Sequence, residues 1–157
     1  MEKVLYDAGV RKPNGGAYNW KGSNDMWRNA LDWRGSVEDC ISIYGKVPDG
    51  AWVFILKYDG GEKERGYNDG EGNAKHVGIY VGNDQVRDST RSTKSKRDGV
   101  GYRPLSDFNM VGICKYLDYE SNNKDNTHDN HPFSATIGNS WSYRFENMYL
   151  PITENKI

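Results

Sequence analysis

A predicted β-hairpin in the middle of the chain constrains the fold more than any other feature of the sequence. The run His76–Val81 is short and apolar, Gly82–Asp84 can form a tight turn, and Gln85–Asp88 can return as the paired strand. A second apolar run, Ala51–Leu56, follows turn-forming residues and is typical of a buried central strand. The sequence therefore predicts an antiparallel sheet that contains this hairpin.

Helices are predicted on the N-terminal side of this sheet. Three segments have apolar residues on one face and capping residues at an end, namely Gly9, Ser23 and a capping box at Ser36. These segments are Glu2–Ala8, Asn24–Leu31 and Ser36–Tyr44. Further strands are expected at residues 100–103 and 110–119, and loops at residues 11–22 and 59–75. Helices followed by an antiparallel β meander are typical of the α+β class.

The composition changes after residue 119. Residues 1–119 hold the apolar runs and are predicted to form one domain, whereas residues 120–131 contain no apolar side chain and are predicted to be a linker. Residues 132–157 regain aromatic side chains but are too few for a core of their own. We expect this aromatic tail either to dock on the domain or to begin a further, truncated domain.

Charge and composition exclude several functional classes. The chain has 157 residues, 21 Lys and Arg against 22 Asp and Glu, and a net charge of −1, so nothing favours a dedicated nucleic-acid binder. No apolar run approaches the ~20 residues of a membrane helix, and the first residues carry no export signal. The two cysteines form no metal-binding pattern and no phosphate-binding glycine motif is present, so we expect neither metal nor cofactor.

His76 and Asp88 are the candidate catalytic residues. His76 opens an apolar strand, where packing does not require a polar ring, and it is well placed to act as a general base. Asp88 follows 12 residues later in the paired strand, so we expect the two side chains on one face of the sheet, within hydrogen-bond reach. A carboxylate there could hold the imidazole in one tautomer, as in a catalytic triad. The structural alternative is a surface histidine and a solvated aspartate.

Three segments together resemble the NlpC-type peptidoglycan endopeptidases, which are papain-like cysteine peptidases. Pro48–Phe54 is similar to the family's strand PGDLVFF, and His76–Asn83 is similar to its strand and turn HVGIYIGNG. Val86–Thr90 is similar to its segment VIHAS, and residues 110–119 suit its last strand. The resemblance covers residues 1–119. CHAP-type amidases share the architecture but have a different strand signature, so they come second.

The resemblance implies a papain-like fold with a catalytic triad. It assigns the general base to His76 and the orienting position to Asp88, where the family more often has His, Asn or Gln. The family's nucleophile is a cysteine in a DCSGL motif that opens the first helix, and that helix ends in a motif similar to Tyr6–Val10 here. We therefore expect the nucleophile upstream of Met1, so that this chain lacks the start of the catalytic helix. A missing N-terminal segment or a partner chain would supply it.

Other residues carry weaker signals. Cys40 lies inside a predicted helix and Cys114 inside an apolar strand, so neither is favoured as a replacement nucleophile. His128 and His131, with Asp125 and Asp129, could chelate a metal, but they lie in the predicted linker. A basic stretch is either a solvated loop or a contact for an anionic polymer, and it comprises Arg87, Arg91, Lys94, Lys96, Arg97 and Arg103. Three tryptophans are expected mostly in the core: Trp20, Trp27 and Trp33.

The resemblance implies an enzyme that cuts amide bonds in the peptide stems of peptidoglycan, outside the cell or in the cell wall. Because the nucleophile is expected upstream of Met1, this chain alone is expected to be inactive. The alternative is a non-catalytic module that keeps the groove and binds cell-wall peptides.

Overall fold

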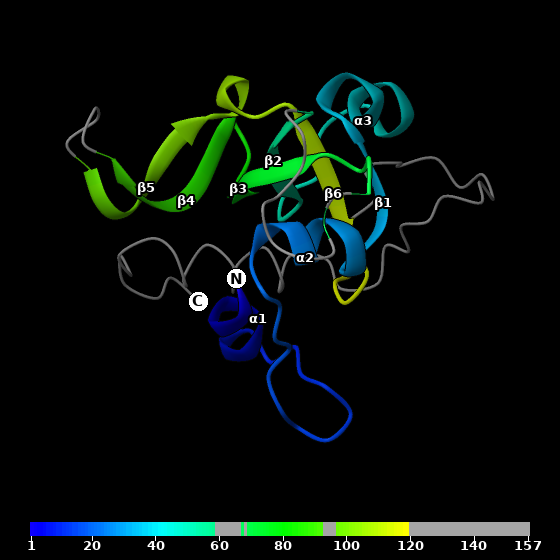
Figure 1. Ribbon diagram of the computed structural model, residues 1–157, viewed down its shortest axis with the longest axis vertical. Helices are drawn as coiled ribbons and strands as arrows, with labels where there is room; N and C mark the ends of the chain where they lie inside the picture. Colours follow the sequence, from blue (N-terminus) through cyan, green and yellow to red (C-terminus); the bar gives the residue numbers. More distant parts are fainter. Residues whose placement is uncertain (59–66, 68, 93–96, 120–157) are drawn as a thin grey trace, which may run out of the picture. The chain divides into compact units, whose positions relative to one another are not determined.

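The computed structural model describes residues 1–58, 67, 69–92 and 97–119, and it confirms the α+β class (Figure 1). Its elements are α1 (Glu2–Asp7), α2 (Ser23–Asn29), β1 (Leu31–Ser36), α3 (Val37–Tyr44), β2 (Trp52–Lys57), β3 (Asn73–Tyr80), β4 (Gln85–Ser92), β5 (Arg97–Pro104), the 3-10 helix η1 (Leu105–Asp107) and β6 (Met110–Cys114). The predicted linker 120–131, with its candidate metal ligands, and the aromatic tail 132–157 lie outside the described residues.

The chain divides into two compact units. The larger unit, Trp20–Cys114, contains the sheet, α2 and α3, while the smaller unit combines Met1–Asn19 with the described residues from Lys115 onward. In the smaller unit, the rings of Tyr18 and Tyr116 stack with their centroids 3.9 Å apart. Both candidate catalytic residues lie in the larger unit.

The described strands form one antiparallel sheet in the order β1-β6-β2-β3-β4-β5. Strand β2 lies between β6 and β3, and its residues Trp52, Val53 and Phe54 are almost completely buried. The buried central strand predicted from residues 51–56 is therefore confirmed. Its apolar run is continuous because both faces of the strand are covered.

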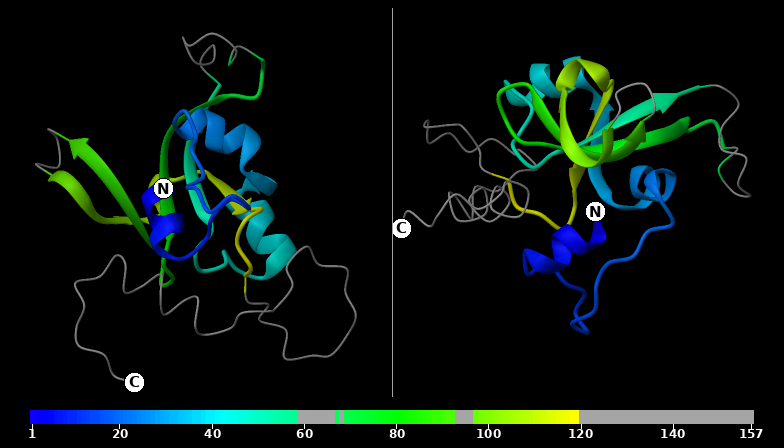
Figure 2. Two further views of the ribbon diagram at one scale, coloured as in Figure 1. Left: turned by 90° about the horizontal axis from the view of Figure 1, so that it is seen from below. Right: turned by 90° about the vertical axis from the view of Figure 1, so that its left-hand side faces the viewer.

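Helices α2 and α3 pack on opposite faces of the sheet. Trp27 of α2 meets Phe54 of β2 edge-on, with ring centroids 5.2 Å apart, and Tyr44 of α3 meets Trp33 of β1 at 5.5 Å. The strand register puts Trp33 and Phe54 on opposite faces, because their partners on β6 are three residues apart. The β4–β5 hairpin extends away from both helices (Figures 1 and 2).

The capping signals have different outcomes in α2 and α3. The Ser36 cap is confirmed, because its Oγ accepts a hydrogen bond from the Asp39 N–H at 2.9 Å, and Gly45 ends the helix with a φ of 79°. The cap predicted at Ser23 is wrong, because Gly22 occupies the N-cap position of α2. The Ser23 hydroxyl instead donates to the carbonyl of Ala74 and so links α2 to β3.

Several strand boundaries differ from the expectations. The predicted 24–31 helix ends at Asn29, and its last predicted residue, Leu31, begins β1, because Leu31 and its successors pair with β6. β3 begins at Asn73, inside the predicted loop, and β4 and β5 extend to 8 residues each. The strand expected at 110–119 ends at Cys114. The extra strand residues are largely polar, so pairing with a neighbour rather than an apolar pattern determines these boundaries.

Candidate functional site

A β-bulge in β3 determines where His76 points. Ile55 pairs with His76, but the next pair is Leu56 with Ala74, so Lys75 is an extra residue in the strand. Ala74 therefore lies on the sheet face that α2 covers, whereas His76 lies on the opposite face. Bulges often re-aim a side chain in this way beside functional sites.

Asp88 reaches His76 across the β3–β4 hairpin. Because Ile79 pairs with Arg87, Asp88 lies opposite Gly78 and diagonal to His76 on the same face of the sheet. The Asp88 Oδ2 is 2.6 Å from the His76 Nε2. The predicted juxtaposition of these two side chains is therefore confirmed.

Gly78 makes room for this contact. A Cβ atom at this position would lie 2.4 Å from the Val86 Cγ1 and 3.3 Å from the Asp88 Cβ. A larger residue would push both neighbours away, so Asp88 would lose its position beside His76. This role of Gly78 was not predicted from the sequence. The signal was a glycine inside an apolar strand, which often marks the close approach of another group.

The contact favours one tautomer of a neutral imidazole. Toward a carboxylate, which only accepts hydrogen bonds, Nε2 would be the donor and Nδ1 would keep its lone pair. The Asp88 side chain is 0% exposed, whereas that of His76 is 22% exposed. The pair thus joins a buried carboxylate to a partly accessible imidazole, an arrangement that is compatible with general base catalysis.

Arg103 and Phe108 also lie beside the pair. The Arg103 Nη1 is 3.5 Å from the Asp88 Oδ2, and its Nε donates to Asp107 at 2.9 Å. The guanidinium lies 5.2 Å from the centre of the Phe108 ring, and that ring stacks beside His76 at 6.1 Å. Arg103 was predicted only as part of the basic stretch, and Phe108 was not predicted as a site residue. Only the strand register, which pairs β5 with β4, brings Arg103 to this face.

Neither cysteine is placed as a nucleophile. Cys40 is buried, and this burial raises the pKa of its thiol to about 12. Its Sγ lies 3.9 Å from the carbonyl oxygen of Lys46, which can accept a hydrogen bond only from the protonated thiol. Cys114 is a buried thiol in β6. A nucleophilic cysteine needs both access and a stabilised thiolate, and Cys40 has neither.

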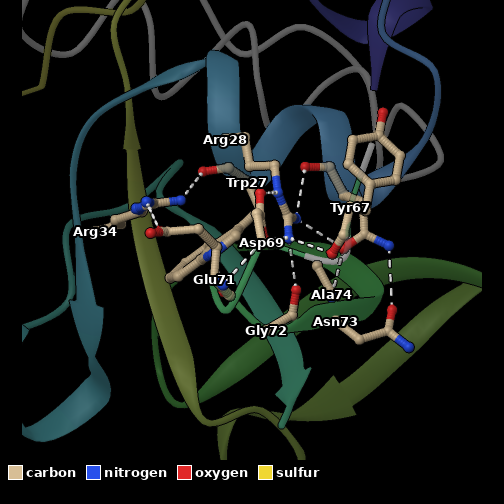
Figure 3. A network of polar contacts seen from close by, with 10 residues as sticks. Trp27, Arg28, Arg34, Tyr67, Asp69, Glu71, Gly72, Asn73 and Ala74 are labelled. Carbon is tan, nitrogen blue, oxygen red and sulfur yellow. Dashed lines mark hydrogen bonds and ion pairs between the residues drawn. The ribbon is translucent and has the colours of Figure 1, made fainter. Parts of the chain in front are cut away.

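A polar network holds the segment that leads into β3 (Figure 3). Arg28 of α2 forms two bonds of 2.7 Å with the carboxylate of Asp69. It also donates to the carbonyls of Tyr67 and Gly72, at 3.3 and 2.8 Å. The hydrogen bonds from Arg28 hold the pKa of the Asp69 carboxyl well below its usual range. Arg28 therefore fixes the backbone just before β3.

Contacts from α2 and β1 extend this network to the first residues of β3. Arg34 pairs with the carboxylate of Glu71, and the Trp27 Nε1 donates to the Glu71 carbonyl at 3.2 Å (Figure 3). The Asn24 Oδ1 accepts a hydrogen bond from the Ala74 N–H at 2.8 Å. The strand that carries His76 is thus attached to α2 immediately before its bulge.

The remaining sequence signals lie apart from the His76–Asp88 pair. Trp20 packs edge-on against Trp52 with ring centroids 5.4 Å apart, so the core role expected for it is confirmed. Arg87 lies over the ring of Tyr102 at 4.4 Å.

Within the described ranges, no group of three or more His, Cys, Asp or Glu side chains could hold a metal ion. No helix of the described part is long and apolar enough to cross a membrane.

Comparisons of the chain with models of protein families, with curated proteins and with solved structures find no match. The function is therefore inferred from the geometry of the site and from the sequence motifs that carry it.

Proposed function

We propose that the chain contains, over residues 1–119, a papain-like, NlpC-type domain that acts on amide bonds in the peptide stems of peptidoglycan. In this proposal His76 is the general base and Asp88 orients it. The observation that carries the proposal is the 2.6 Å contact between the His76 Nε2 and the Asp88 Oδ2 on adjacent strands. This substrate would place the protein outside the cell or in the cell wall.

The chemistry of the pair is proton transfer at Nδ1. In the first step, Nδ1 takes the proton of an attacking thiol and gives it to the leaving amine, which leaves the acyl group on the sulfur as a thioester. In the second step, Nδ1 takes a proton from the water that attacks the thioester and returns it to the departing thiol, which releases the carboxylic acid. Asp88 accepts the Nε2 hydrogen bond throughout and stabilises the imidazolium that forms in between. Backbone N–H groups beside the nucleophile would stabilise the oxyanion of the tetrahedral intermediate. The Phe108 ring stacks beside the imidazole, with ring centroids 6.1 Å apart.

Neither cysteine of the sequence is assigned as the attacking thiol. Cys40 and Cys114 are the only cysteines in the sequence, and both are buried. We assign the nucleophile to a family-like DCSGL motif, contributed by an N-terminal segment or by a partner chain. That motif would place a cysteine at the start of a helix, where the helix dipole favours the thiolate.

The same two buried thiols favour a second candidate function, a non-catalytic module that binds cell-wall peptides. In that case the His76 Nδ1 would accept a hydrogen bond from a stem amide instead of removing a proton from a thiol. The two functions share a ligand class and differ only in whether the bound peptide is cleaved.

The test combines binding and cleavage of purified muropeptides. We expect the chain itself to bind them in calorimetry and to leave them intact in mass spectrometry. The same chain, extended before Met1 by the family's DCSGL motif, is expected to cleave them. The matched control is the same extended chain with serine in place of the motif cysteine. This control chain should bind the muropeptides without cleaving them.

Each outcome decides between the functions. In the extended chain, His76→Gln should abolish cleavage and retain binding, as expected for removal of the base. Cleavage by the unextended chain that disappears in Cys40→Ala would contradict the assignment and identify Cys40 as the nucleophile. Binding without cleavage by every version would favour the binding module. Neither binding nor cleavage by any version would refute both functions.

A further inference from the structure

Arg103 belongs to a closed ring of contacts around the candidate base. Its Nη1 forms an ion pair with Asp88 at 3.5 Å, and its guanidinium lies over the Phe108 ring. Asp88 in turn contacts His76, and Phe108 stacks on the same imidazole. The Arg103 Nε is held from the other side by Asp107 of η1. These contacts fix the guanidinium in both position and orientation.

Arg103 is one charged partner of the buried Asp88. Its side chain is 0% exposed, and an ionised carboxylate removed from water needs hydrogen bonds or a cation beside it. His76 supplies a positive charge only while its ring is protonated. Arg103 carries its charge at every pH at which the protein is folded, so it compensates the carboxylate in both states of the ring.

We propose that Arg103 is a positioning residue that keeps Asp88 ionised and directed at His76 whether the imidazole is neutral or protonated. A proton taken up by the base then stays on the ring and is not passed to the carboxylate. The role of Arg103 in catalysis rests on the proposed function. Its electrostatic effect on Asp88 and on the His76 ring does not, because it depends only on this chain.

The groups that face the ring define how its protonation responds to a change at Arg103. Among the described residues they include Asp88 from β4, Phe108 from the loop before β6 and Ile55 from β2; Arg103 from β5 contacts Asp88 and Phe108, and Asp107 from η1 contacts Arg103. Without the guanidinium, protonating the imidazole becomes a more favourable way to compensate Asp88. The ring should then hold its proton to higher pH and serve less well as a base.

The test follows the His76 ring by NMR in the isotope-labelled full chain, without any substrate. The sequence has 3 histidines, and the signals of His76 are identified by their loss in His76→Gln. In Arg103→Gln, we expect the midpoint of the ring titration to rise by about one pH unit, the size typical of a neighbouring charge. In Arg103→Lys, which keeps the charge, the midpoint should stay within a few tenths of a unit of the wild-type value.

Asp107→Asn is the matched control, because it removes the other carboxylate partner of Arg103 and leaves the guanidinium in place. It should not raise the midpoint. An unchanged midpoint in Arg103→Gln would overturn the proposal and leave Arg103 a purely structural role. If Arg103→Gln is unfolded at pH 8, the proposal requires it to fold at pH 5.5, where the imidazolium supplies the charge. A variant unfolded at both pH values would also overturn it.

Failure of this inference is distinguishable from failure of the proposed function. The titration reports only on the charge balance around His76, whereas the muropeptide experiment reports only on binding and cleavage. A shifted midpoint together with no muropeptide binding would support the role of Arg103 and refute the peptidoglycan substrate.

Discussion

Gly78 controls how close Asp88 can come to His76. It lies opposite Asp88 in the hairpin, and its missing side chain leaves the space that Val86 and Asp88 occupy. The extra residue Lys75 provides the other condition, because it turns His76 to the face on which Asp88 lies. The site therefore depends on two backbone features as much as on its two reactive side chains.

Gly78→Ala should lower the free energy of unfolding by about 1–3 kcal/mol, the usual cost of overpacking a filled core. The new Cβ would meet Val86 at 2.4 Å, and displacement of Asp88 should also move the NMR signals of the His76 ring. Urea unfolding and ring spectra measure the two effects.

Gly45→Ala provides the control for this prediction. Nothing lies within 4 Å of a Cβ at Gly45, but its φ of +79° is unfavourable for alanine. This variant should lose stability without moving the His76 signals. If the ring spectra of Gly78→Ala and the wild type coincide, Gly78 does not set the contact.

The thiol of Cys40 should be unreactive in the native chain. Burial raises its pKa from 9.0 to about 12, so it stays protonated and covered at pH 8. We expect a thiol reagent to label it only after urea unfolding, with mass spectrometry locating the label. Rapid labelling of Cys40 under native conditions would contradict its burial and would reopen its assignment as nucleophile.

The same shift predicts a loss of stability in alkali. The pKa of Cys40 is higher in the folded chain than in the unfolded chain, so its contribution is present below about pH 9 and is lost as the pH rises toward 12. The free energy of unfolding of the wild type should therefore fall more steeply over this range than that of Cys40→Ala. Parallel pH profiles for the two chains would contradict the prediction.

At the scale of elements, α2 fixes the start of the strand that carries His76. Its N-terminal residues bond to Ala74, and Arg28 binds the segment before β3 through Asp69 and Gly72. The bulge at Lys75 follows directly. The anchored end of β3 therefore determines where the side chains of this strand change from one face of the sheet to the other. Loosening this anchor should therefore disturb the first residues of the strand before it disturbs the rest of the sheet.

Arg28→Gln should lower Tm by about 5 °C, because the carbonyls of Tyr67 and Gly72 lose a charged hydrogen-bond donor. Amide hydrogen exchange should become faster at Asn73 and Ala74. Arg28 lowers the pKa of Asp69. The stabilisation that comes from the Arg28–Asp69 ion pair is therefore present above pH ~4 and is lost as the pH falls below it. The Tm difference between the two chains should therefore narrow in acid.

Lys3→Gln is the matched control for Arg28→Gln. Lys3 also pairs with a carboxylate, that of Asp7 at 2.6 Å, but the two side chains are 86% and 42% exposed. Exposed pairs of this kind contribute little to stability, so Tm should hardly change. Equal effects of the two substitutions would mean that Arg28 is an ordinary surface ion pair.

At the scale of the whole molecule, local patterns predicted the middle of the sheet and missed its edges. The run Ala51–Leu56 and the turn at Gly82–Asp84 are local signals, and they yielded β2 and the hairpin correctly. Strand β1 was missed because its partner β6 lies some 80 residues away and its own sequence does not alternate. The bulge at Lys75 has no sequence signature, so the start of β3 was also missed.

The candidate site was likewise predicted only in part: the residues of one hairpin were found, and those from later elements were missed. His76 and Asp88 were predicted because both belong to one hairpin, whose turn sets their register. Arg103 and Phe108 come from later elements, and only the pairing of β5 with β4 and the turn at η1 bring them to the ring. Long-range register is the physical information that a local reading of the sequence lacks.

The central claim is that Asp88 holds the His76 ring with Nε2 protonated and Nδ1 ready to accept a proton. Nitrogen-15 NMR of the neutral ring in the labelled full chain tests this most directly, because the two ring nitrogens have distinct signals in each tautomer. We predict that the hydrogen resides on Nε2 in the wild type and that Asp88→Ala gives a mixture of tautomers. A wild-type ring with its hydrogen on Nδ1, or with the same mixture as the variant, would contradict the claim.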